Sequence, residues 1–231
     1  MMIYWKNDGE LFSLIRDQLY TSVVGDAMDK LGCLHQFLPP QIKPLHTGMK
    51  IAGRAMPVLE ADVDSDSFVN GYQHLADKPF GLMLEALDDL KKDEVYICSG
   101  SSPAYALWGE LMSARAMKLG AAGAVVNGYS RDTHGILSLN FPVFSYGRYA
   151  QDQAPRGKVL DFRIPIEIEK VKICPGDIVV GDIDGVCIVP QQIEKEVFSR
   201  ALEKALGEKK VQQKIKEGMS AKEAFDKYGI M

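Results

Sequence analysis

Three charged residues, Glu110, Arg131 and Asp132, stand at a spacing that can bring their side chains to one place. Apolar residues recur at helical spacing over residues 107–117, and residues 124–126 (Ala-Val-Val) predict a short buried strand. Ten residues of helix carry the chain about 15 Å away from Glu110, and a strand of four or five residues returns by roughly the same distance. Because 20 residues separate Glu110 from Arg131, we expect all three charged groups at the same edge of a sheet.

The predicted edge has the chemistry of a site for a metal ion and a small anion. Helix N-termini and strand C-termini gather at this edge in α/β folds, and ligands usually bind there. The N–H groups of Leu111 and Met112 lie in the first turn of the predicted helix, where they are free to bind an anion. Two carboxylates, a guanidinium and such a helix end suit a divalent cation that holds a small carboxylate. The alternative interpretation is a cluster of ion pairs at a subunit interface.

Composition limits the classes of function. The chain has 231 residues, of which 46% are hydrophobic and 25% charged, and its formal net charge is −4. These values are ordinary for a globular protein, and no broad basic field exists to hold nucleic acid or an anionic membrane. Four scattered cysteines show no metal-ligand spacing and are expected to be buried, reduced thiols. With no signal-peptide pattern and no 18-residue apolar run, we expect a cytoplasmic protein.

The elements that position the charged edge follow from hydrophobic periodicity and turn residues. Asp184-Gly185 is a turn dipeptide between two apolar runs, which predicts a β-hairpin. Thr21 or Ser22 is expected to cap the second of two N-terminal helices, and residues 220–223 form a capping box. Residues 61–68 predict an acidic loop, since the glycine and closing glutamate of a calcium-binding loop are missing. We expect helices within 10–32, at 79–90 and from 191 onward, and strands at 51–59, 94–100, 178–180 and 186–189.

One long stretch resembles the signature of a known family. The sequence WGELMSARAMKLGAAGAVVNGYSRD is similar to the signature of the RraA-like family. The similarity extends through VVGDAMDKLG, IAGRAMPV, NFPVF and PGDIVVGDIDGVCIVP in the family's order, over about residues 20 to 190. The family includes metal-dependent 4-hydroxy-4-methyl-2-oxoglutarate / 4-carboxy-4-hydroxy-2-oxoadipate aldolases, which also decarboxylate oxaloacetate. The long C-terminal helices look more like these aldolases than like the shorter ribonuclease regulators.

The resemblance implies a fold and an assembly. The fold is an α/β swivelling-domain β/β/α three-layer sandwich with helical N- and C-terminal extensions. Residues 1–231 would form a single RraA-like domain, with a core at about 20–190 and a C-terminal helical arm at 191–231. The resemblance further implies a homotrimer or a homohexamer built as a pair of trimers, with active sites between subunits. The sequence does not locate an acid donated by the neighbouring subunit, and the helices of residues 191–216 are the place to look for one.

The family's acid-x20-Arg-Asp motif implies roles for individual residues. By this resemblance Asp132 binds Mg²⁺ or Mn²⁺ directly, and Glu110 holds the metal through a water molecule. Arg131 contacts the 2-oxo acid substrate, and Gly109 with the N–H groups of Leu111 and Met112 binds its carboxylate. The first acid of the motif is Asp in the characterised aldolases, whereas here it is Glu110.

These roles imply a class II pyruvate aldolase, a carbon–carbon lyase that cleaves 4-hydroxy-2-oxo diacids. Cleavage next to a 2-oxo acid leaves a pyruvate enolate, which a divalent cation and Arg131 stabilise. Water steered by Glu110 takes the proton from the substrate hydroxyl. Oxaloacetate decarboxylation needs the same enolate and no base. Lysine Schiff-base chemistry is the competing strategy, but no lysine maps to this edge.

Two other functions remain as alternatives. The chain can be a non-catalytic RraA-like regulator that binds a ribonuclease or another protein, as some relatives do. Family members have also been labelled methyltransferases. A nucleotide-type methyl donor normally needs a glycine-rich turn directly after the first strand, and IAGRAMP does not supply one.

Overall fold

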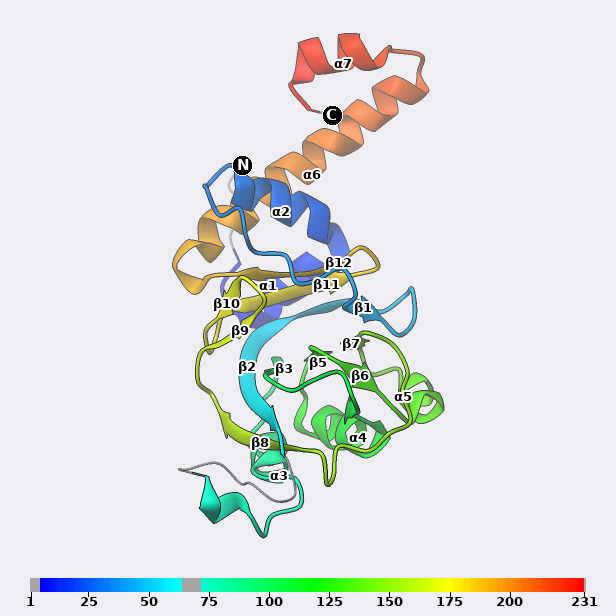
Figure 1. Ribbon diagram of the computed structural model, residues 1–231. Helices are drawn as coiled ribbons and strands as arrows, with labels where there is room; N and C mark the ends of the chain where they lie inside the picture. The colour runs from blue at the N-terminus through cyan, green and yellow to red at the C-terminus, as the bar shows by residue number, and fades with distance from the viewer. Residues whose placement is uncertain (1–4, 64–71, 231) are drawn as a thin grey trace.

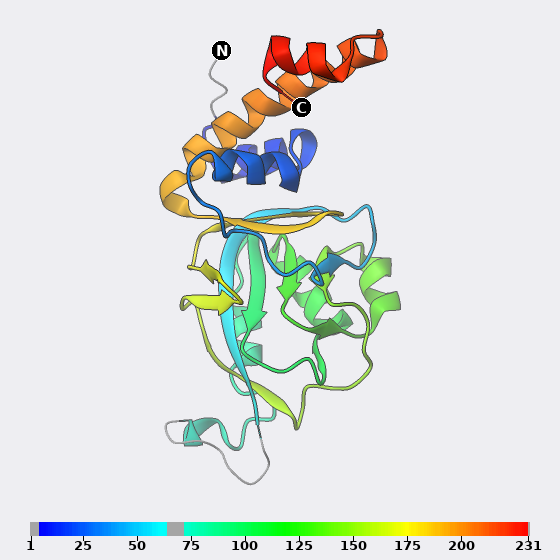
Figure 2. The same cartoon turned by 45° about the horizontal axis from the view of Figure 1, so that its top comes forward.

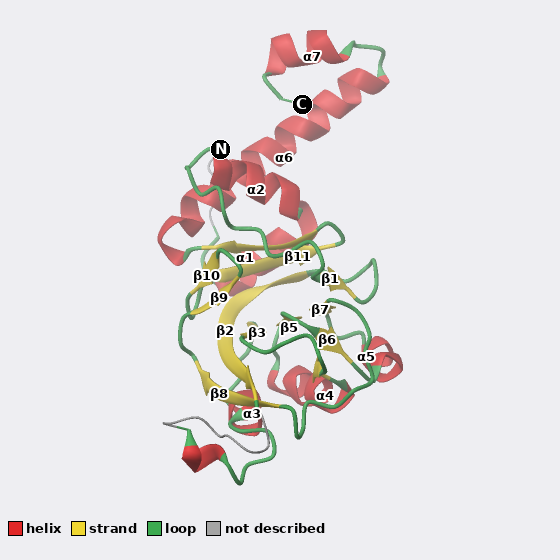
Figure 3. Ribbon diagram, viewed as in Figure 1, coloured by secondary structure: helices red, strands yellow, loops and turns green. Residues whose placement is uncertain are grey.

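The computed structural model describes residues 5–63 and 72–230. Asp64 and Asp66 of the predicted acidic loop therefore lie outside the described residues. The predicted mixed α/β fold is confirmed: a strongly curved sheet has one group of helices on each side (Figures 1 and 3).

Eight strands of the described chain form one sheet, in the order β1-β7-β5-β3-β2-β11-β12, with β8 paired to β2. Within this sheet, the neighbouring strands β2, β3, β5 and β7 run parallel to one another, and the other strand pairs of the sheet are antiparallel. Two smaller pairs, β9 with β10 and β4 with β6, lie beside this sheet. The strands are β1 (Lys43–Pro44), β2 (Ile51–Asp62), β3 (Glu94–Ser99), β4 (Ala106–Trp108), β5 (Gly123–Val126), β6 (Tyr129–Ser130), β7 (Val143–Ser145), β8 (Gly157–Phe162), β9 (Ile166–Ile168), β10 (Val171–Ile173), β11 (Ile178–Asp182) and β12 (Gly185–Val189).

Alternating side chains of the parallel strands divide the interior into two cores. Val95, Ile97 and Val125 face a core that β9, β10, β11 and β12 close from the other side. Tyr96 and Cys98 face the opposite way, into a core closed by helices. These helices are α3 (Met83–Asp88), α4 (Glu110–Leu119) and α5 (Thr133–Leu139). The period of two along each strand thus builds the predicted β/β/α order of layers.

The N- and C-terminal helices form a further layer on the outer face of β11 and β12 (Figures 1 and 2). This layer consists of α1 (Asp8–Gln18), α2 (Thr21–Asp29) and the first half of α6 (Glu194–Lys216), which follows the short 3₁₀ turn η2 (Gln191–Ile193). Helix α7 (Ala221–Tyr228) comes after α6, and a second 3₁₀ turn, η1 (Gln73–Leu75), precedes α3 in the chain. The distal half of α6 and α7 project away from the sheet as an arm (Figure 2). The predicted capping box at Ser220 and Glu223 is present. No helix in the described ranges is long and apolar enough to cross a membrane.

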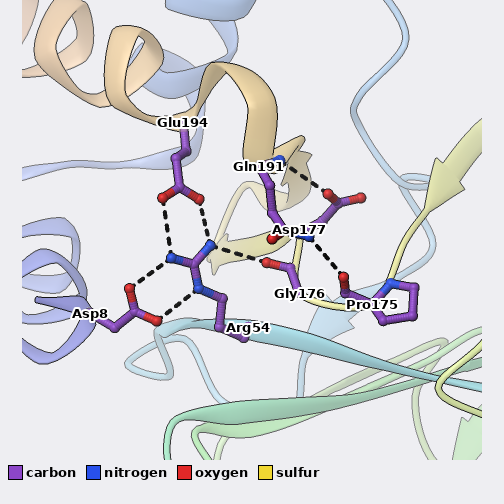
Figure 4. Close-up of polar contacts among 7 residues, drawn as sticks. All are labelled: Asp8, Arg54, Pro175, Gly176, Asp177, Gln191 and Glu194. Atoms are coloured by element: carbon purple, nitrogen blue, oxygen red, sulfur yellow. Dashed lines mark hydrogen bonds and ion pairs between the residues drawn. The ribbon is translucent and has the colours of Figure 1, made fainter.

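One guanidinium ties three of these elements together. Arg54, on β2, makes paired hydrogen bonds to the carboxylates of Asp8 on α1 and Glu194 on α6 (Figure 4). Arg54 Nη1 also donates to the carbonyl oxygen of Gly176, 3.1 Å away. Because both carboxylates favour the charged guanidinium, the pKa of Arg54 is raised, and the hydrogen bonds from Arg54 hold the pKa of Asp8 below its usual range.

One predicted helix start was wrong. The N-cap of α2 is Tyr20, and neither Thr21 nor Ser22 caps the helix with its side chain. Thr21 instead donates from its N–H and its hydroxyl to the carboxylate of Asp182 at 2.8 and 2.7 Å, because packing places the β11 turn against the start of α2. The helical spacing included Leu107, which lies in strand β4, whereas the ten helical residues expected from Glu110 onward are confirmed by α4 (Glu110–Leu119).

Candidate active site

The N-terminus of α4 provides free N–H groups at the edge of the fold. Gly109 is the N-cap with extended backbone (φ −150°, ψ −175°), and α4 has no side-chain capping hydrogen bond from the described residues. The start of the helix is fixed from inside: Trp108 Nε1 donates to Ser113 Oγ at 2.7 Å, and Ser113 Oγ donates to the Gly109 carbonyl at 3.0 Å. The N–H groups of Leu111 and Met112 therefore point out of a rigid helix end.

The pairing of β4 with β6 brings Arg131 and Asp132 to this helix end. The Arg131 N–H donates to the Trp108 carbonyl at 2.9 Å. Asp132 follows with left-handed backbone (φ 53°, ψ 36°) as the N-cap of α5. A Cβ atom added to Gly109 would lie 2.8 Å from Asp132 Oδ2, so the carboxylate occupies space that only a glycine leaves open. The 20 residues between Glu110 and Arg131 thus lead away along α4 and return along β5 to the same edge, as the helix and strand lengths predicted.

Acidic groups hold the Arg131 guanidinium on two sides. Arg131 Nε lies 3.7 Å from Asp132 Oδ2, and Nη1 lies 3.3 Å from Asp152 Oδ1. All three side chains are between 36% and 47% exposed, so a ligand can reach them. Sequence reasoning missed Asp152, which lies in the polar loop after β7 with no motif or periodicity to distinguish it.

Glu110 shares the edge but points elsewhere. Its carboxyl packs against Gly135 on α5, where an added Cβ would lie 2.1 Å from Glu110 Cδ. Glu110 is exposed and is not among the residues that line the cavity described below. The negative charge in the first turn of α4 is favourable because it faces the positive end of the helix dipole. His134, which follows Asp132 by two residues, is also absent from the cavity lining.

A cavity of about 240 Å³ opens in front of Arg131. One end is polar and carries Arg131, Asp132, Asp152 and Gln153. The other walls are apolar and are made by Phe80, Met83, Leu84, Leu87, Ala106, Leu107, Trp108, Gly109, Leu111 and Met112. The cavity therefore has one cationic group beside two carboxylates, which suits a small anion bound together with a cation.

The donor set fits a sparsely held magnesium or manganese ion. No cluster of three or more His, Cys, Asp or Glu side chains able to hold a metal exists within residues 5–63 and 72–230. Mg²⁺ commonly binds through one or two protein carboxylates and keeps water and substrate oxygens as its other ligands. Asp132, half exposed in the space left by Gly109, offers such a carboxylate, with Asp152 on the far side of Arg131. The residues thus fit a metal ion that takes one or two ligands from the protein and the others from water and substrate.

Fold and site together define the class: an α/β protein of three layers, with an Arg–Asp pair facing an uncapped helix end. The model of the RraA-like family, described as Aldolase/RraA, matches residues 21–188, and the chain belongs to this family. The fit covers the sheet, the cavity and the helices α2 to α5.

Individual relatives are similar over most of this chain. A protein of Halalkalibacterium halodurans, provisionally named 4-hydroxy-4-methyl-2-oxoglutarate aldolase, is 29% identical over 89% of both chains. DlpA of Legionella pneumophila is also 29% identical over 89% of this chain, which spans only 32% of the length of DlpA.

Solved structures agree on the fold. A structure described as a novel cellulase from gut-associated microbes has a TM-score of 0.78 and 35% identity, covering 90% of this chain and 89% of that one. RraAS2 of Streptomyces coelicolor, an unusual member of the RNase ES inhibitor RraA family, has a TM-score of 0.76 and covers 91% of this chain and 99% of its own. At 20% identity, this comparison shows only that the two proteins share a fold.

Proposed function

We propose that the chain is a divalent-metal-dependent pyruvate aldolase that cleaves 4-hydroxy-2-oxo acids and decarboxylates oxaloacetate through a pyruvate enolate. The observation that carries this proposal is the placement of Arg131 and Asp132 against the free N-terminus of α4, within one cavity. Relatives named as 4-hydroxy-4-methyl-2-oxoglutarate aldolases support the reaction class.

The carboxylates supply the metal site in this proposal. Asp132 would hold Mg²⁺ or Mn²⁺ directly, and Glu110 would hold a water of its shell. When bound, the ion acts as a Lewis acid toward the substrate carbonyl. The Glu110 side chain lies against Gly135, outside the cavity lining. To hold a metal-bound water, its carboxyl must therefore turn from α5 toward the cavity.

Arg131 and the helix end bind the substrate. The N–H groups of Leu111 and Met112 are free to donate to the substrate carboxylate, and the helix dipole favours the negative charge there. Asp132 and Asp152 lie at ion-pair distance from Nε and Nη1 of Arg131, which favours one direction of its guanidinium before the substrate binds. Preorganised donors of this kind contribute about 10²–10³ in rate.

The first experiment measures pyruvate release from oxaloacetate and from 4-hydroxy-4-methyl-2-oxoglutarate. Wild type and Asp132→Ala are compared, each with Mg²⁺ and with EDTA. We expect turnover that EDTA and the substitution both abolish, because Asp132 is the carboxylate proposed to bind the metal directly, in the space that Gly109 leaves open.

Identical background rates in both proteins would reject the enzyme. That result would favour a non-catalytic regulator that binds a ribonuclease or another protein, which is the second candidate that the RraA-type fold allows. A pull-down with a ribonuclease, without metal or 2-oxo acid, then becomes the decisive measurement.

A further inference from the structure

Glu60 is a buried carboxylic acid directly behind the wall of the candidate site. It lies at a β-bulge where the pairing of β2 with β8 shifts register between Leu59 and Glu60, and it is only 1% exposed. Its Oε2 accepts a hydrogen bond from Gln153 Nε2 at 3.1 Å. Its Oε1 has no hydrogen-bond partner among the described residues. An acid without a cation is costly to bury, so its presence calls for a physical reason.

The partner of Glu60 belongs to the site. Gln153 lines the cavity, and the residue before it, Asp152, forms the ion pair with Arg131. Several contacts hold the surrounding loop: the Gln151 carbonyl accepts from the Ala106 N–H at 2.8 Å, the Gln153 carbonyl accepts from the N–H groups of Arg156 and Gly157, and Arg156 Nη1 donates to the Asp152 carbonyl at 3.2 Å. The Arg156 contact is exposed, so the bond from the Gln153 side chain to Glu60 is the buried side-chain anchor next to Asp152.

We propose that Glu60 is a positioning residue: by holding Gln153 it fixes Asp152, and through Asp152 it fixes the direction of the Arg131 guanidinium. This inference rests on the proposed function, since it assigns Arg131 a role toward the substrate. Glu60 is buried and does not line the cavity, so it acts through Gln153 and not on the reacting atoms. The bulge is the local device that turns the Glu60 side chain toward this loop.

The surroundings of Glu60 keep it neutral near pH 7. Burial raises the pKa of Glu60 to about 8; the Cys98 thiol beside it lowers the pKa in part, and the charge of Asp62 raises it further. The other titratable groups facing it are Tyr96 on β3 and Tyr105, both phenols that are neutral at this pH. A neutral carboxyl still accepts from the Gln153 amide, and a glutamine at position 60 offers the same acceptor.

Three variants separate positioning from folding. Glu60→Leu removes the acceptor for Gln153, Glu60→Gln keeps it, and Tyr96→Phe removes another buried polar atom without a partner while leaving Gln153 untouched. We expect Glu60→Leu to lower kcat for oxaloacetate by about tenfold or more with little change in KM, because misplacing a catalytic group costs rate. Glu60→Gln is expected to keep the wild-type kcat, because the glutamine carbonyl accepts from the Gln153 amide in the same place. Tyr96→Phe should match wild type.

A second readout does not depend on turnover. Amide hydrogen exchange over residues 150–157 should be faster in Glu60→Leu than in Glu60→Gln or Tyr96→Phe, because the loop has lost its side-chain anchor. If Glu60→Leu keeps both the wild-type kcat and the wild-type exchange rates, the positioning role is wrong. If the wild type itself releases no pyruvate, the proposed function fails, and the exchange rates alone decide whether Glu60 anchors the loop.

Discussion

The direction of the Arg131 guanidinium matters as much as its charge. The side chain bridges Asp132 and Asp152 through two different nitrogens, Nε and Nη1. A lysine offers a single ammonium that cannot make both contacts in one fixed plane. We therefore expect Arg131→Lys to lower kcat for oxaloacetate decarboxylation by about 10²-fold even though the positive charge remains. Arg148→Lys, in the loop after β7 and outside the cavity lining, is the control. A Lys variant with wild-type kcat would show that charge alone suffices.

Gly109 has a steric role at the same scale. Its extended backbone is one that alanine adopts without strain, yet an alanine Cβ would lie 2.8 Å from Asp132 Oδ2. We expect Gly109→Ala to push the carboxylate aside and to weaken Mn²⁺ binding by about tenfold, with little change in the melting temperature. Calorimetric titration with Mn²⁺ measures this, and Gly9→Ala in helix α1 is the matched control. Unchanged Mn²⁺ affinity would remove Asp132 from the metal site.

At the scale of elements, Arg54 joins helix α1, strand β2 and helix α6. Replacing it with methionine leaves Asp8 and Glu194 without their cation, and we expect a loss of about 2 kcal/mol in unfolding free energy at pH 7. The loss should depend on pH. Because the pKa of Asp8 is lowered in the folded state, its contribution is complete above the unfolded pKa and disappears as the pH falls through the folded one.

The difference between wild type and Arg54→Met should therefore shrink as the pH falls below about 4. Urea unfolding at pH 7, 4 and 3 gives the required values. Arg200→Met, which breaks an exposed pair within α6, should have an effect well under 1 kcal/mol and no such pH dependence. If the difference in unfolding free energy between wild type and Arg54→Met is the same at all three pH values, the titration of Asp8 does not contribute to the pH dependence of stability.

At the scale of the whole molecule, the C-terminal arm presents apolar side chains to solvent. Phe225 on α7 is 55% exposed and Leu206 on α6 is 51% exposed, while the first half of α6 is packed on α2. We propose that the chain forms a trimer or a pair of trimers, as the resemblance implied. Sedimentation should then give three or six times the chain mass of 25.6 kDa.

Phe225→Lys is expected to lower this mass if the arm takes part in the contact between subunits. Lys222→Glu, exposed on the same helix, serves as the control for a change of charge. A wild-type chain that sediments as a monomer would contradict the assembly, and an unchanged mass for Phe225→Lys would move the contact away from α7.

The sequence alone determined the features that depend on local geometry. Rise per residue in a helix and in a strand predicted that residue 110 returns to the edge that carries Arg131 and Asp132. The Asp184-Gly185 turn and the capping box of Ser220 and Glu223 followed from turn and capping preferences. These features are set by residues close together in the chain, which is why they can be read from it.

Only the tertiary structure decided which distant groups meet. Asp152 reaches Arg131 because its loop is anchored to β4 and to Glu60, and Thr21 binds Asp182 because α2 packs on the β11 turn. The direction of Glu110 depends on the space above Gly135. Each of these contacts joins residues from separate elements, so it depends on how the layers pack, and no local pattern encodes that packing.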